Sequence, residues 1–355
     1  MKRIILTGGG TAGHVTPHIA LIPRLKELGF EIHYVGRKFG IEKDLIEQTG
    51  IPYHFISAGK FRRYFDIKNA TDIFLIGRGF IKSLYLVRKL RPDLIFSKGG
   101  FVSCPLVWAA WVNRVPIIIH ESDITPGFAN RLSTPFSDHI CFSFPETEEK
   151  LPEGKATFTG IPVRETLLSG DRSEGKKICS FTDAKPILLV VGGSQGSKTI
   201  NSTIRAALDD ILVTFNVCHL CGHGEVSANF EARPGYKQFE YVDREMQHLL
   251  IMADVVVSRA GATTLFELLE LKKANLLIPL SLKASRGDQI LNAKSFEKQG
   301  FSQVLMEEDL NAGSLIESIR RTYSNRDAMV EAMNSRGPVN GLNKVLEIIG
   351  VYAAL

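Results

Sequence analysis

The stretch Ser258-Arg-Ala-Gly261-Ala-Thr-Thr-Leu-Phe-Glu267 decides the fold, because it links a strand pattern to a helix pattern through a turn of small residues. The run before it, residues 253–257, reads Ala-Asp-Val-Val-Val, an apolar and β-branched pattern typical of a buried parallel strand. Apolar residues then recur at helical spacing over 265–272. A strand, a turn and a helix in this order form the repeating unit of parallel α/β sheets.

The start of this predicted helix is suited to a nucleotide. Unpaired N–H groups and the positive end of the helix dipole favour a phosphate there, and the carboxylate of Glu267 can accept hydrogen bonds from both hydroxyls of a ribose. The plainer alternative is that Gly261 only permits a tight turn and that Glu267 is a solvated helix residue. Features elsewhere in the chain favour the nucleotide.

Three further strand patterns end in glycine-rich turns, at residues 8–13, 99–103 and 192–197. Two of the four turns precede residue 160 and two follow it, so one pattern occurs twice along the chain. This duplication predicts an α/β fold of two Rossmann-like domains facing a cleft. The cleft is the expected ligand site, with polar backbone on both walls to grip a pyrophosphate.

A change of composition marks the expected domain boundary. Residues 146–155 are charged and contain a proline and a glycine, which places the boundary near 158–163. The last segment, residues 341–355, has the pattern of a helix that could pack on either domain. We expect it to pack on the N-terminal domain. The expected segments are the domains 1–160 and 161–340 and the helix 341–355.

The glycine turns also exclude some chemistry. None of them reads G-x-x-x-x-G-K-[ST], which argues against phosphoryl transfer from ATP. Gly8, Gly10 and Gly13 have dinucleotide spacing, but residues 36–38 read Gly-Arg-Lys where NAD binding needs an acidic residue. No Asp-x-Asp sequence, the usual metal handle for a nucleotide sugar, occurs anywhere. We therefore expect no metal, no other cofactor and a reaction that proceeds in EDTA.

The charge of the chain is concentrated in its first half. Residues 1–160 contain 21 Lys and Arg against 15 Asp and Glu, a net charge of +6, whereas all 355 residues together carry +5. Much of the excess lies in 59–91, where nine basic residues and two acidic ones alternate with aromatic and aliphatic side chains. This mixture suits a membrane surface with anionic lipid, although a surface helix with a core-facing apolar side needs the same residues.

The remaining totals describe an ordinary globular chain. Hydrophobic residues make up 44% and charged residues 23%. Five scattered cysteines fit a reducing compartment, and the single C-x-x-C at 218–221 lacks a second pair to complete a zinc site. We expect no secretory signal, since residues 2–6 run directly into glycines, and no apolar run approaches the roughly 18 residues of a membrane span. Any membrane contact should be peripheral.

Seven motifs, in order along the whole chain, resemble those of the MurG family, the peptidoglycan N-acetylglucosaminyltransferases that convert lipid I to lipid II. They are Gly9-Gly-Thr-Ala-Gly-His14-Val-Thr-Pro17, Gly99-Gly-Phe-Val-Ser-Cys-Pro105, His120-Glu121, Gly160-Ile-Pro-Val-Arg164, Gly192-Gly-Ser-Gln-Gly196, Ser258–Glu267 and Asp288-Gln-Ile-Leu-Asn292. The resemblance implies two domains in the glycosyltransferase-B arrangement, with a donor domain at 161–340 and an acceptor and membrane-associating domain at 1–160. It implies an inverting transfer of GlcNAc from UDP-GlcNAc to the C4 hydroxyl of MurNAc in undecaprenyl-pyrophosphoryl-MurNAc-pentapeptide.

The resemblance also implies roles for individual residues. Glu267 would bind the donor ribose, as the helix argument also proposes, and Val242 the uracil through its backbone. Arg164 would bind the nucleotide, Gln289 the GlcNAc ring, and Asn292 would lie nearby. Other donor-side residues would be Thr11, Ala12, Gly13, Ser194, Gln195, Ala262, Thr263 and Thr264, and the acceptor pyrophosphate would lie on Gly9, Gly10, Gly99, Gly100 and Ser103. Asp123 and Asp288 depart from the family, where many members have Asn and Gln.

Displacement at an anomeric carbon needs a base for the attacking hydroxyl and a positive environment for the departing UDP. His14, beside the first glycine turn, is the first candidate for the base, although a histidine there could instead donate to a phosphate. Glu121, at the end of a buried strand pattern, is the second, and an ion pair is its plainer explanation. Because the sequence has no metal handle, the helix starts after Gly193 and Gly261 would stabilise the negative charge on the departing UDP.

The partners implied are UDP-GlcNAc, lipid I, the cytoplasmic face of the bacterial membrane and other cell-wall synthesis proteins, with no nucleic acid. Three other functions stay open on the sequence: a glycosyltransferase acting on a lipid such as diacylglycerol, an epimerase of UDP-GlcNAc, and a sensor or scaffold that binds the nucleotide sugar without turnover. Acceptor-side glycine turns favour an acceptor with a pyrophosphate over diacylglycerol.

Overall fold

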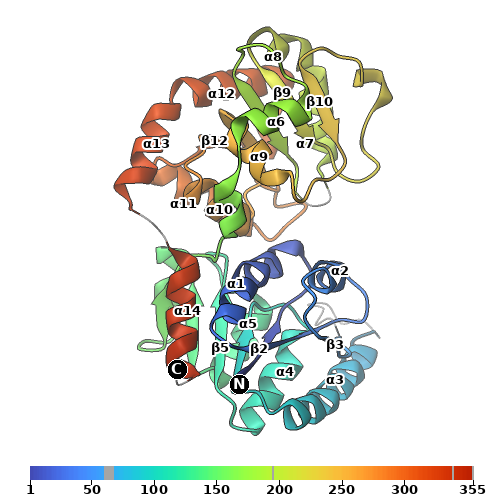
Figure 1. Ribbon diagram of the computed structural model, residues 1–355, viewed down its shortest axis with the longest axis vertical. Helices are drawn as coiled ribbons and strands as arrows, with labels where there is room; N and C mark the ends of the chain where they lie inside the picture. Colours follow the sequence, from blue (N-terminus) through green and yellow to red (C-terminus); the bar gives the residue numbers. More distant parts are fainter. Residues whose placement is uncertain (60–67, 194–195, 338–339, 354–355) are drawn as a thin grey trace. The chain divides into compact units, whose positions relative to one another are not determined.

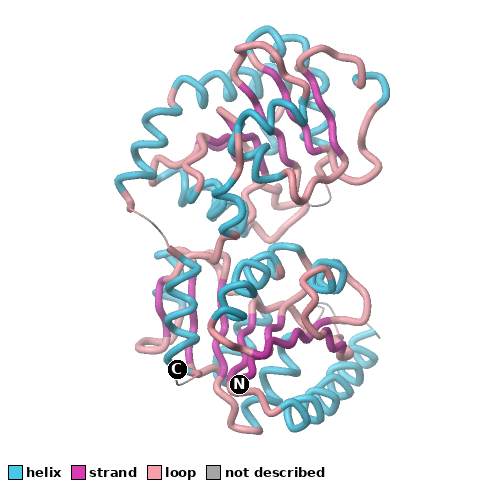
Figure 2. The backbone as a smooth tube through the Cα atoms, in the orientation of Figure 1, coloured by secondary structure: helices cyan, strands magenta, loops and turns pink. Residues whose placement is uncertain are grey.

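The protein is described from a computed structural model, which covers residues 1–59, 68–193, 196–337 and 340–353. The chain divides into two compact units, Met1–Arg164 with Asn340–Leu355, and Glu165–Val339. Each unit is a parallel sheet covered by helices, as Figures 1 and 2 show. The fold class predicted from the duplicated glycine turns is confirmed, since every strand pair among the described residues is parallel.

The sheet of the first unit has seven strands in the order β3-β2-β1-β4-β5-β6-β7. Its central strands are apolar and fully buried, as expected for strands with helices on both faces. The strands are β1 (Arg3–Thr7), β2 (Glu31–Gly36), β3 (Tyr53–Phe55), β4 (Leu94–Ser97), β5 (Ile117–Glu121), β6 (His139–Phe142) and β7 (Ala156–Phe158).

Alternate residues of these strands supply two cores. On one face, Ile4 and Leu6 pack with the apolar residues of α1 (Thr16–Glu27). On the other face, Ile5 packs with residues of α3 (Lys68–Leu90) and α4 (Ser103–Val112). Because successive side chains of a strand point to opposite faces, one apolar run fills both cores.

The C-terminal helix α14 (Gly341–Tyr352) belongs to the first unit. Leu342, Val345, Leu346 and Ile349 are buried in the core that α1 and β1 form, and Figure 1 shows this red helix beside the strands of that unit. A side chain at residue 341 would collide with the backbone of Ile161, which explains the glycine at the first position of the helix.

The sheet of the second unit has six strands in the order β10-β9-β8-β11-β12-β13. Its core joins β8, β9, β11 and β12 to the helices α7, α8 and α12. The strands are β8 (Ile187–Val191), β9 (Asn216–Leu220), β10 (Tyr236–Phe239), β11 (Val255–Ser258), β12 (Asn275–Leu277) and β13 (Gln303–Val304). The helices include α6 (Arg172–Cys179), α7 (Lys198–Ala206), α8 (Leu208–Thr214), α9 (Met246–Met252), α10 (Ala262–Glu270), α11 (Asp288–Lys298), α12 (Ala312–Ser324) and α13 (Arg326–Ser335).

Each sheet reverses its strand order at one point, between β1 and β4 in the first unit and between β8 and β11 in the second. The paired strands end level with each other, since Thr7 pairs with Ser97 and Val191 pairs with Ser258. All four glycine turns begin within three residues of the ends of these four strands. They therefore flank the two switch points, where open parallel sheets bind ligands.

Shorter elements complete the chain. The first unit also contains the helices α2 (Ile41–Glu47) and α5 (Phe128–Ser133) and the 3-10 helices η1 (Ala12–His14), η2 (Thr134–Phe136) and η3 (Pro145–Lys150). The second contains the 3-10 helices η4 (Glu165–Ser169), η5 (Ala228–Phe230) and η6 (Glu307–Asp309).

Candidate functional site

The two glycine turns of the first unit touch each other. Gly100 has a φ of 85°, and a Cβ atom built on it would lie 2.3 Å from the carbonyl oxygen of Gly9. Only glycine allows the two backbones to approach this closely. Gly10, with a φ of 101°, faces open space instead, so the outer part of the first turn has room for a ligand. The structure thus brings Gly9, Gly10, Gly99 and Gly100 together at one switch point.

Ser103, the other residue expected to hold the acceptor, is fully buried. Its hydroxyl donates to the carbonyl oxygen of Gly100 over 2.7 Å, and its backbone N–H donates to the same atom over 3.0 Å. The side chain is therefore used to close the second glycine turn at the start of α4.

His14 lies at the end of η1, directly after the first glycine turn. Its Nδ1 is 3.1 Å from the carbonyl oxygen of Gly9 and 3.2 Å from the hydroxyl of Thr11. A carbonyl oxygen can only accept, so this contact places the proton of a neutral imidazole on Nδ1. Nε2 then carries the lone pair, which is the form that a general base requires.

Glu121, the second candidate for the base, is 4% exposed at the end of β5. Its carboxylate accepts from the backbone N–H groups of Asp123 and Gly127 and from the Asn130 side chain, at 3.0, 2.9 and 2.8 Å. Burial, and next the charge of Asp123, raise the pKa of Glu121 in spite of these hydrogen bonds. The ion pair considered as its plainer explanation is not what the structure describes here. Three N–H donors instead tie this carboxylate to the loop at 123–130.

The start of α10 is open in the second unit. Its N-cap is Gly261, which supplies no side-chain hydrogen bond to the first turn and has open space above its Cα. The start of α7 differs, because the hydroxyl of Ser197 accepts from the N–H of Ile200 and so caps that helix itself. Of these two helix starts, only the one at Ala262–Thr264 has an N-cap residue without a side chain to bond its first turn, which suits the approach of an anion to the helix dipole.

Glu267 lies on α10 at the position predicted for a ribose contact, between one and two turns from the helix start. The side chain is half-buried. Val242 is buried in the loop after β10, and Arg164 is half-buried at the end of the first unit. Ser194 and Gln195, expected to bind the donor phosphates, lie outside the described residues.

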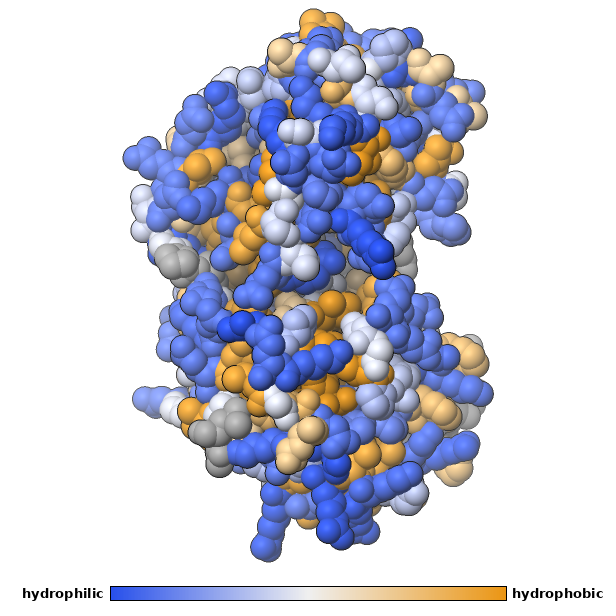
Figure 3. All heavy atoms as spheres, in the orientation of Figure 1, coloured by the Kyte–Doolittle hydropathy of each residue, from blue (hydrophilic) through white to orange (hydrophobic). Residues whose placement is uncertain are grey.

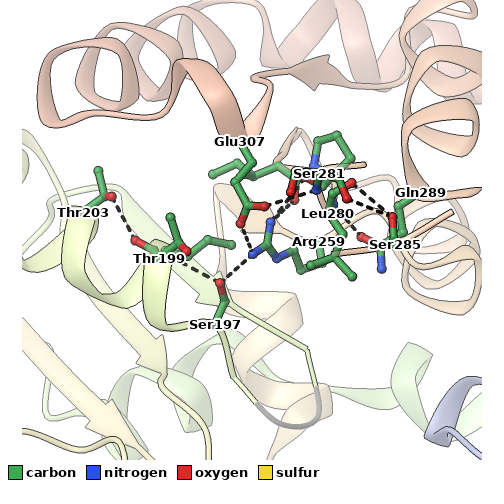
Figure 4. A network of polar contacts seen from close by, with 12 residues as sticks. Ser197, Thr199, Thr203, Arg259, Leu280, Ser281, Ser285, Gln289 and Glu307 are labelled. Atoms are coloured by element: carbon green, nitrogen blue, oxygen red, sulfur yellow. Dashed lines mark hydrogen bonds and ion pairs between the residues drawn. The ribbon is translucent and has the colours of Figure 1, made fainter. Parts of the chain in front are cut away.

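Arg259 connects the loops around the switch point of the second unit, as Figure 4 shows. Its guanidinium is nearly buried and donates to the hydroxyl of Ser197, 2.8 Å away, and to the carbonyl oxygen of Ile278, 3.1 Å away. It also pairs with the carboxylate of Glu307. The second oxygen of Glu307 accepts from the backbone N–H of Ser281 over 3.1 Å. One side chain thus joins the third glycine turn, the strand end of β11 and the loop after β12.

Helix α11 is connected to the same loops. Gln289 accepts from the backbone N–H of Leu280 over 3.1 Å, and Figure 4 shows its side chain beside Ser285 and Leu280. Asn292 is fully buried and donates to the carbonyl oxygen of Ala260 over 3.4 Å. The amide of Gln289 is half-buried and remains a candidate for a sugar hydroxyl, whereas Asn292 lies within the protein behind the loop after β11.

The helix α3 exposes large apolar side chains beside basic ones. Phe74, Ile81 and Tyr85 are each more than 60% exposed, and basic residues lie between them. Lys82 lies over the ring of Phe55, 3.4 Å from its centroid. Figure 3 shows hydrophobic and hydrophilic atoms interleaved over this helix at the lower right. Arg62 and Arg63, part of the predicted basic segment, lie outside the described residues. In the part of the chain that the structure describes, no helix is both long and apolar enough to span a bilayer.

Comparison with known proteins agrees with the motifs. Residues 4–142 match the glycosyltransferase family 28 N-terminal domain, and residues 187–347 match the glycosyltransferase family 28 C-terminal domain. The chain is 52% identical over 351 residues to the UDP-N-acetylglucosamine--N-acetylmuramyl-(pentapeptide) pyrophosphoryl-undecaprenol N-acetylglucosamine transferase of Clostridium tetani, covering 99% of this chain and 98% of that one. This chain belongs to the MurG family of glycosyltransferase family 28.

Solved structures confirm the fold of this MurG-family chain. MurG of Acinetobacter baumannii superposes with a TM-score of 0.77 at 23% identity, covering 98% of this chain and 99% of that chain. A putative UDP-N-acetylglucosamine 2-epimerase from Listeria monocytogenes superposes with a TM-score of 0.74 at 12% identity, covering 99% and 96%. The glycosyltransferase-B fold is therefore confirmed, and it is one that a transferase and an epimerase share.

Some polar residues around the MurG-family motifs were not predicted from the sequence. Lys98, Asn130, Arg259 and Glu307 all make side-chain hydrogen bonds beside the glycine turns. Arg259 stands inside the quoted motif, and its charge beside a buried strand pattern was the available signal. Glu307 had no such signal, because it lies 48 residues away in η6.

Proposed function

We propose that this chain transfers N-acetylglucosamine from UDP-GlcNAc to undecaprenyl-pyrophosphoryl-MurNAc-pentapeptide, the step from lipid I to lipid II in peptidoglycan synthesis. The observation that carries the proposal is the full-length 52% identity to a transferase named for this reaction. The acceptor atom is the C4 hydroxyl of MurNAc, and the anomeric carbon inverts because a single displacement places the new bond opposite the departing UDP.

The donor half is proposed on the second unit. The start of α10, where Gly261 supplies no side-chain cap, directs the positive end of the helix dipole at the diphosphate. Glu267, farther along the same helix, accepts from the ribose hydroxyls. Gln289 binds hydroxyls of the sugar. Helix starts of this kind stabilise the negative charge that develops on UDP without a metal ion.

The acceptor half is proposed on the first unit. The pyrophosphate of the acceptor lies on the touching glycine turns around Gly9 and Gly100. His14 removes the proton of the attacking hydroxyl through Nε2, while its Nδ1 stays hydrogen-bonded to the carbonyl oxygen of Gly9. Glu121 holds the 123–130 loop in place through its three hydrogen bonds.

We place the reaction at the cytoplasmic face of the bacterial membrane, with the protein bound peripherally. The acceptor is a lipid, and α3 exposes Phe74, Ile81 and Tyr85 among basic side chains. Apolar side chains enter the headgroup region, and the net charge of +6 in residues 1–160 attracts anionic lipid.

One incubation tests these assignments. Purified protein is mixed with UDP-GlcNAc labelled in the sugar and with a lipid I analogue, in EDTA. Label in the lipid fraction supports the transferase, and loss of transfer in EDTA would contradict the metal-free mechanism. UDP with a free sugar isomer would identify an epimerase, unchanged donor would identify a sensor, and transfer to diacylglycerol in a parallel tube would identify a different lipid acceptor.

A further inference from the structure

Lys98 is a buried amine at the acceptor-side switch point, and the proposed mechanism does not use it. It follows β4 and directly precedes the second glycine turn. Its side chain is 1% exposed. Lysine is almost never fully buried unless it is paired, so its position needs a physical explanation.

The amine is held by two hydrogen bonds at the end of β5. Nζ lies 2.6 Å from Nδ1 of His120 and 2.6 Å from the hydroxyl of Ser122. On its other side, Nε2 of His120 lies 2.8 Å from the carbonyl oxygen of Gly160. Since a carbonyl cannot donate, Nε2 carries the proton of His120 and Nδ1 accepts from Lys98. These contacts fix the position of the ammonium group.

The stem of Lys98 lies under the first glycine turn as well. A Cβ atom built on Gly8 would lie 3.2 Å from the Cβ of Lys98, and the backbone N–H of Lys98 donates to Thr7 over 2.9 Å. Gly100, two residues along, is in contact with Gly9. Lys98 therefore lies next to both glycine turns, and its side chain extends from the end of β4 to the end of β5.

Charged and titratable groups surround this amine on each neighbouring element. His18 approaches from α1, Cys141 from β6, and His120, Glu121 and Asp123 from the end of β5 and its loop. Burial, and next the charge of Lys98, hold the pKa of both histidines well below the usual value, so they are neutral. Burial lowers the pKa of Lys98 to about 7, while Glu121, Asp123 and Cys141 act in the opposite direction.

We propose that Lys98 is a positioning residue for the acceptor: its ammonium group, held at the end of β5 by His120 and Ser122 on a side chain that starts beside the two glycine turns, supplies a full positive charge that attracts a pyrophosphate to these turns. The inference rests on the proposed function, because it assumes that the acceptor diester pyrophosphate lies on these turns. Turn amides carry only partial charges, and a buried cation acts strongly through a medium of low polarisability. Lys98 acts through the turns and does not touch the substrate.

The test is binding of a soluble lipid I analogue without donor, measured by calorimetry at pH 6 and pH 9. A pyrophosphate esterified at both ends does not titrate in this range. If binding needs the charged form of Lys98, this residue contributes to acceptor affinity below its pKa. The contribution is lost as the pH rises through that pKa. Wild-type affinity should therefore fall about tenfold between the two pH values. Lys98→Met should bind about as weakly at pH 6 as wild type does at pH 9, with little further change.

Two variants separate this role from a merely structural one. Lys273→Met removes a half-buried amine, in the second unit, which donates to backbone carbonyl oxygens, and it should leave acceptor binding and its pH dependence unchanged. Ser122→Ala removes one acceptor of Lys98 but keeps the charge. Because the charged form loses a partner, the fall in affinity should move to lower pH. This variant keeps the test decisive if Lys98→Met does not fold.

Acceptor binding by Lys98→Met with wild-type affinity and wild-type pH dependence would overturn the inference, as would an unshifted pH profile in Ser122→Ala. The affinity for UDP-GlcNAc should stay at the wild-type value in Lys98→Met, and a parallel loss of donor affinity would indicate general damage and count against the proposal. If wild-type protein transfers no sugar to lipid I, the proposed function fails; if it does and Lys98→Met binds normally, only this inference fails.

Discussion

The guanidinium of Arg259, at the end of β11, donates to the hydroxyl of Ser197 at the start of α7 over 2.8 Å. This bond joins the two loops that flank the switch point of the second unit. Glu307 completes the arrangement by pairing with Arg259 and accepting from Ser281. Donor binding and the stability of this unit should therefore depend on the same side chain.

Arg259→Met should lower the free energy of unfolding by about 3–5 kcal/mol, because it leaves the Glu307 carboxylate largely buried without its cation. Arg286→Met is the matched control, since Arg286 pairs with Asp288 at a largely exposed position and should cost about 0–1 kcal/mol. Urea unfolding measures both. Equal costs for the two variants would show that the Arg259 pair is not buried in solution.

The same pair predicts a dependence on pH. Burial raises the pKa of Glu307, but the hydrogen bonds from Arg259 and Ser281 outweigh it, so the pKa lies below its usual value. A carboxyl with a lowered folded pKa stabilises the protein above its unfolded pKa of about 4.3 and loses this contribution as the pH falls. The stability difference between wild type and Glu307→Gln should therefore shrink below that pH. Urea titrations at pH 7 and pH 3.5 would measure the change, and a constant difference would contradict the assignment.

Glu267→Ala should weaken the binding of UDP-GlcNAc about tenfold to a hundredfold, because hydrogen bonds to a charged group each contribute about 1.5–3 kcal/mol. Glu270→Ala is the matched control, one turn farther from the start of the same helix. It should leave the affinity unchanged. Calorimetry with UDP-GlcNAc measures both, and an unaltered affinity in Glu267→Ala would remove the ribose assignment.

His14→Ala should reduce turnover by about 10²–10⁴-fold, the range for loss of a general base, with donor affinity nearly intact. The structure supports this prediction through the contact of Nδ1 with Gly9, which leaves Nε2 in the basic form. His223→Ala, on a 94% exposed side chain, controls for unspecific effects. Full activity in His14→Ala would eliminate His14 as the base. The base would then be another group at the switch point of the first unit.

Replacement of Ile81 and Tyr85 by serine should weaken binding to both neutral and anionic vesicles, because their exposed apolar surface enters the lipid. Lys82→Ser with Arg88→Ser should weaken binding to anionic vesicles only, by about 1 kcal/mol for each charge, and less at high salt. Val213→Ser is the control, since Val213 is equally exposed on a helix of the second unit. Sedimentation with vesicles gives the result. If all variants sediment like wild type, the surface of α3 faces solvent and does not bind the membrane.

The glycine turns were predictable because they are written in contiguous sequence. A β-branched run, a glycine and a helical period specify a strand, a turn and a helix through local conformational preference alone. The four turns, the duplication of the pattern and the place of Glu267 on its helix all depend on residues within about one helical turn or one strand of each other. The family motifs lie in the same segments.

Contacts between distant segments were not predictable in this way. Lysine is usually exposed, so Lys98 in Ser97-Lys98-Gly99 indicated only a charged turn, and its burial required β5 to place His120 and Ser122 beside it. The pairing of Arg259 with Glu307 needed η6 to return to the end of β11. The pattern of 341–355 left two packing partners open, and the core around Ile4 resolved them in favour of the first unit.

The sequence by itself determined the kinds of element, their order and the family, because these follow from residue spacing along the chain. The tertiary structure decided which charges are buried, which carboxylate is tied up by N–H donors and which helix start remains uncapped. The reason is physical: burial and hydrogen bonding depend on segments up to 351 residues apart, as when Lys2 donates to Ala353, and no local pattern encodes which distant strand end will be the neighbour.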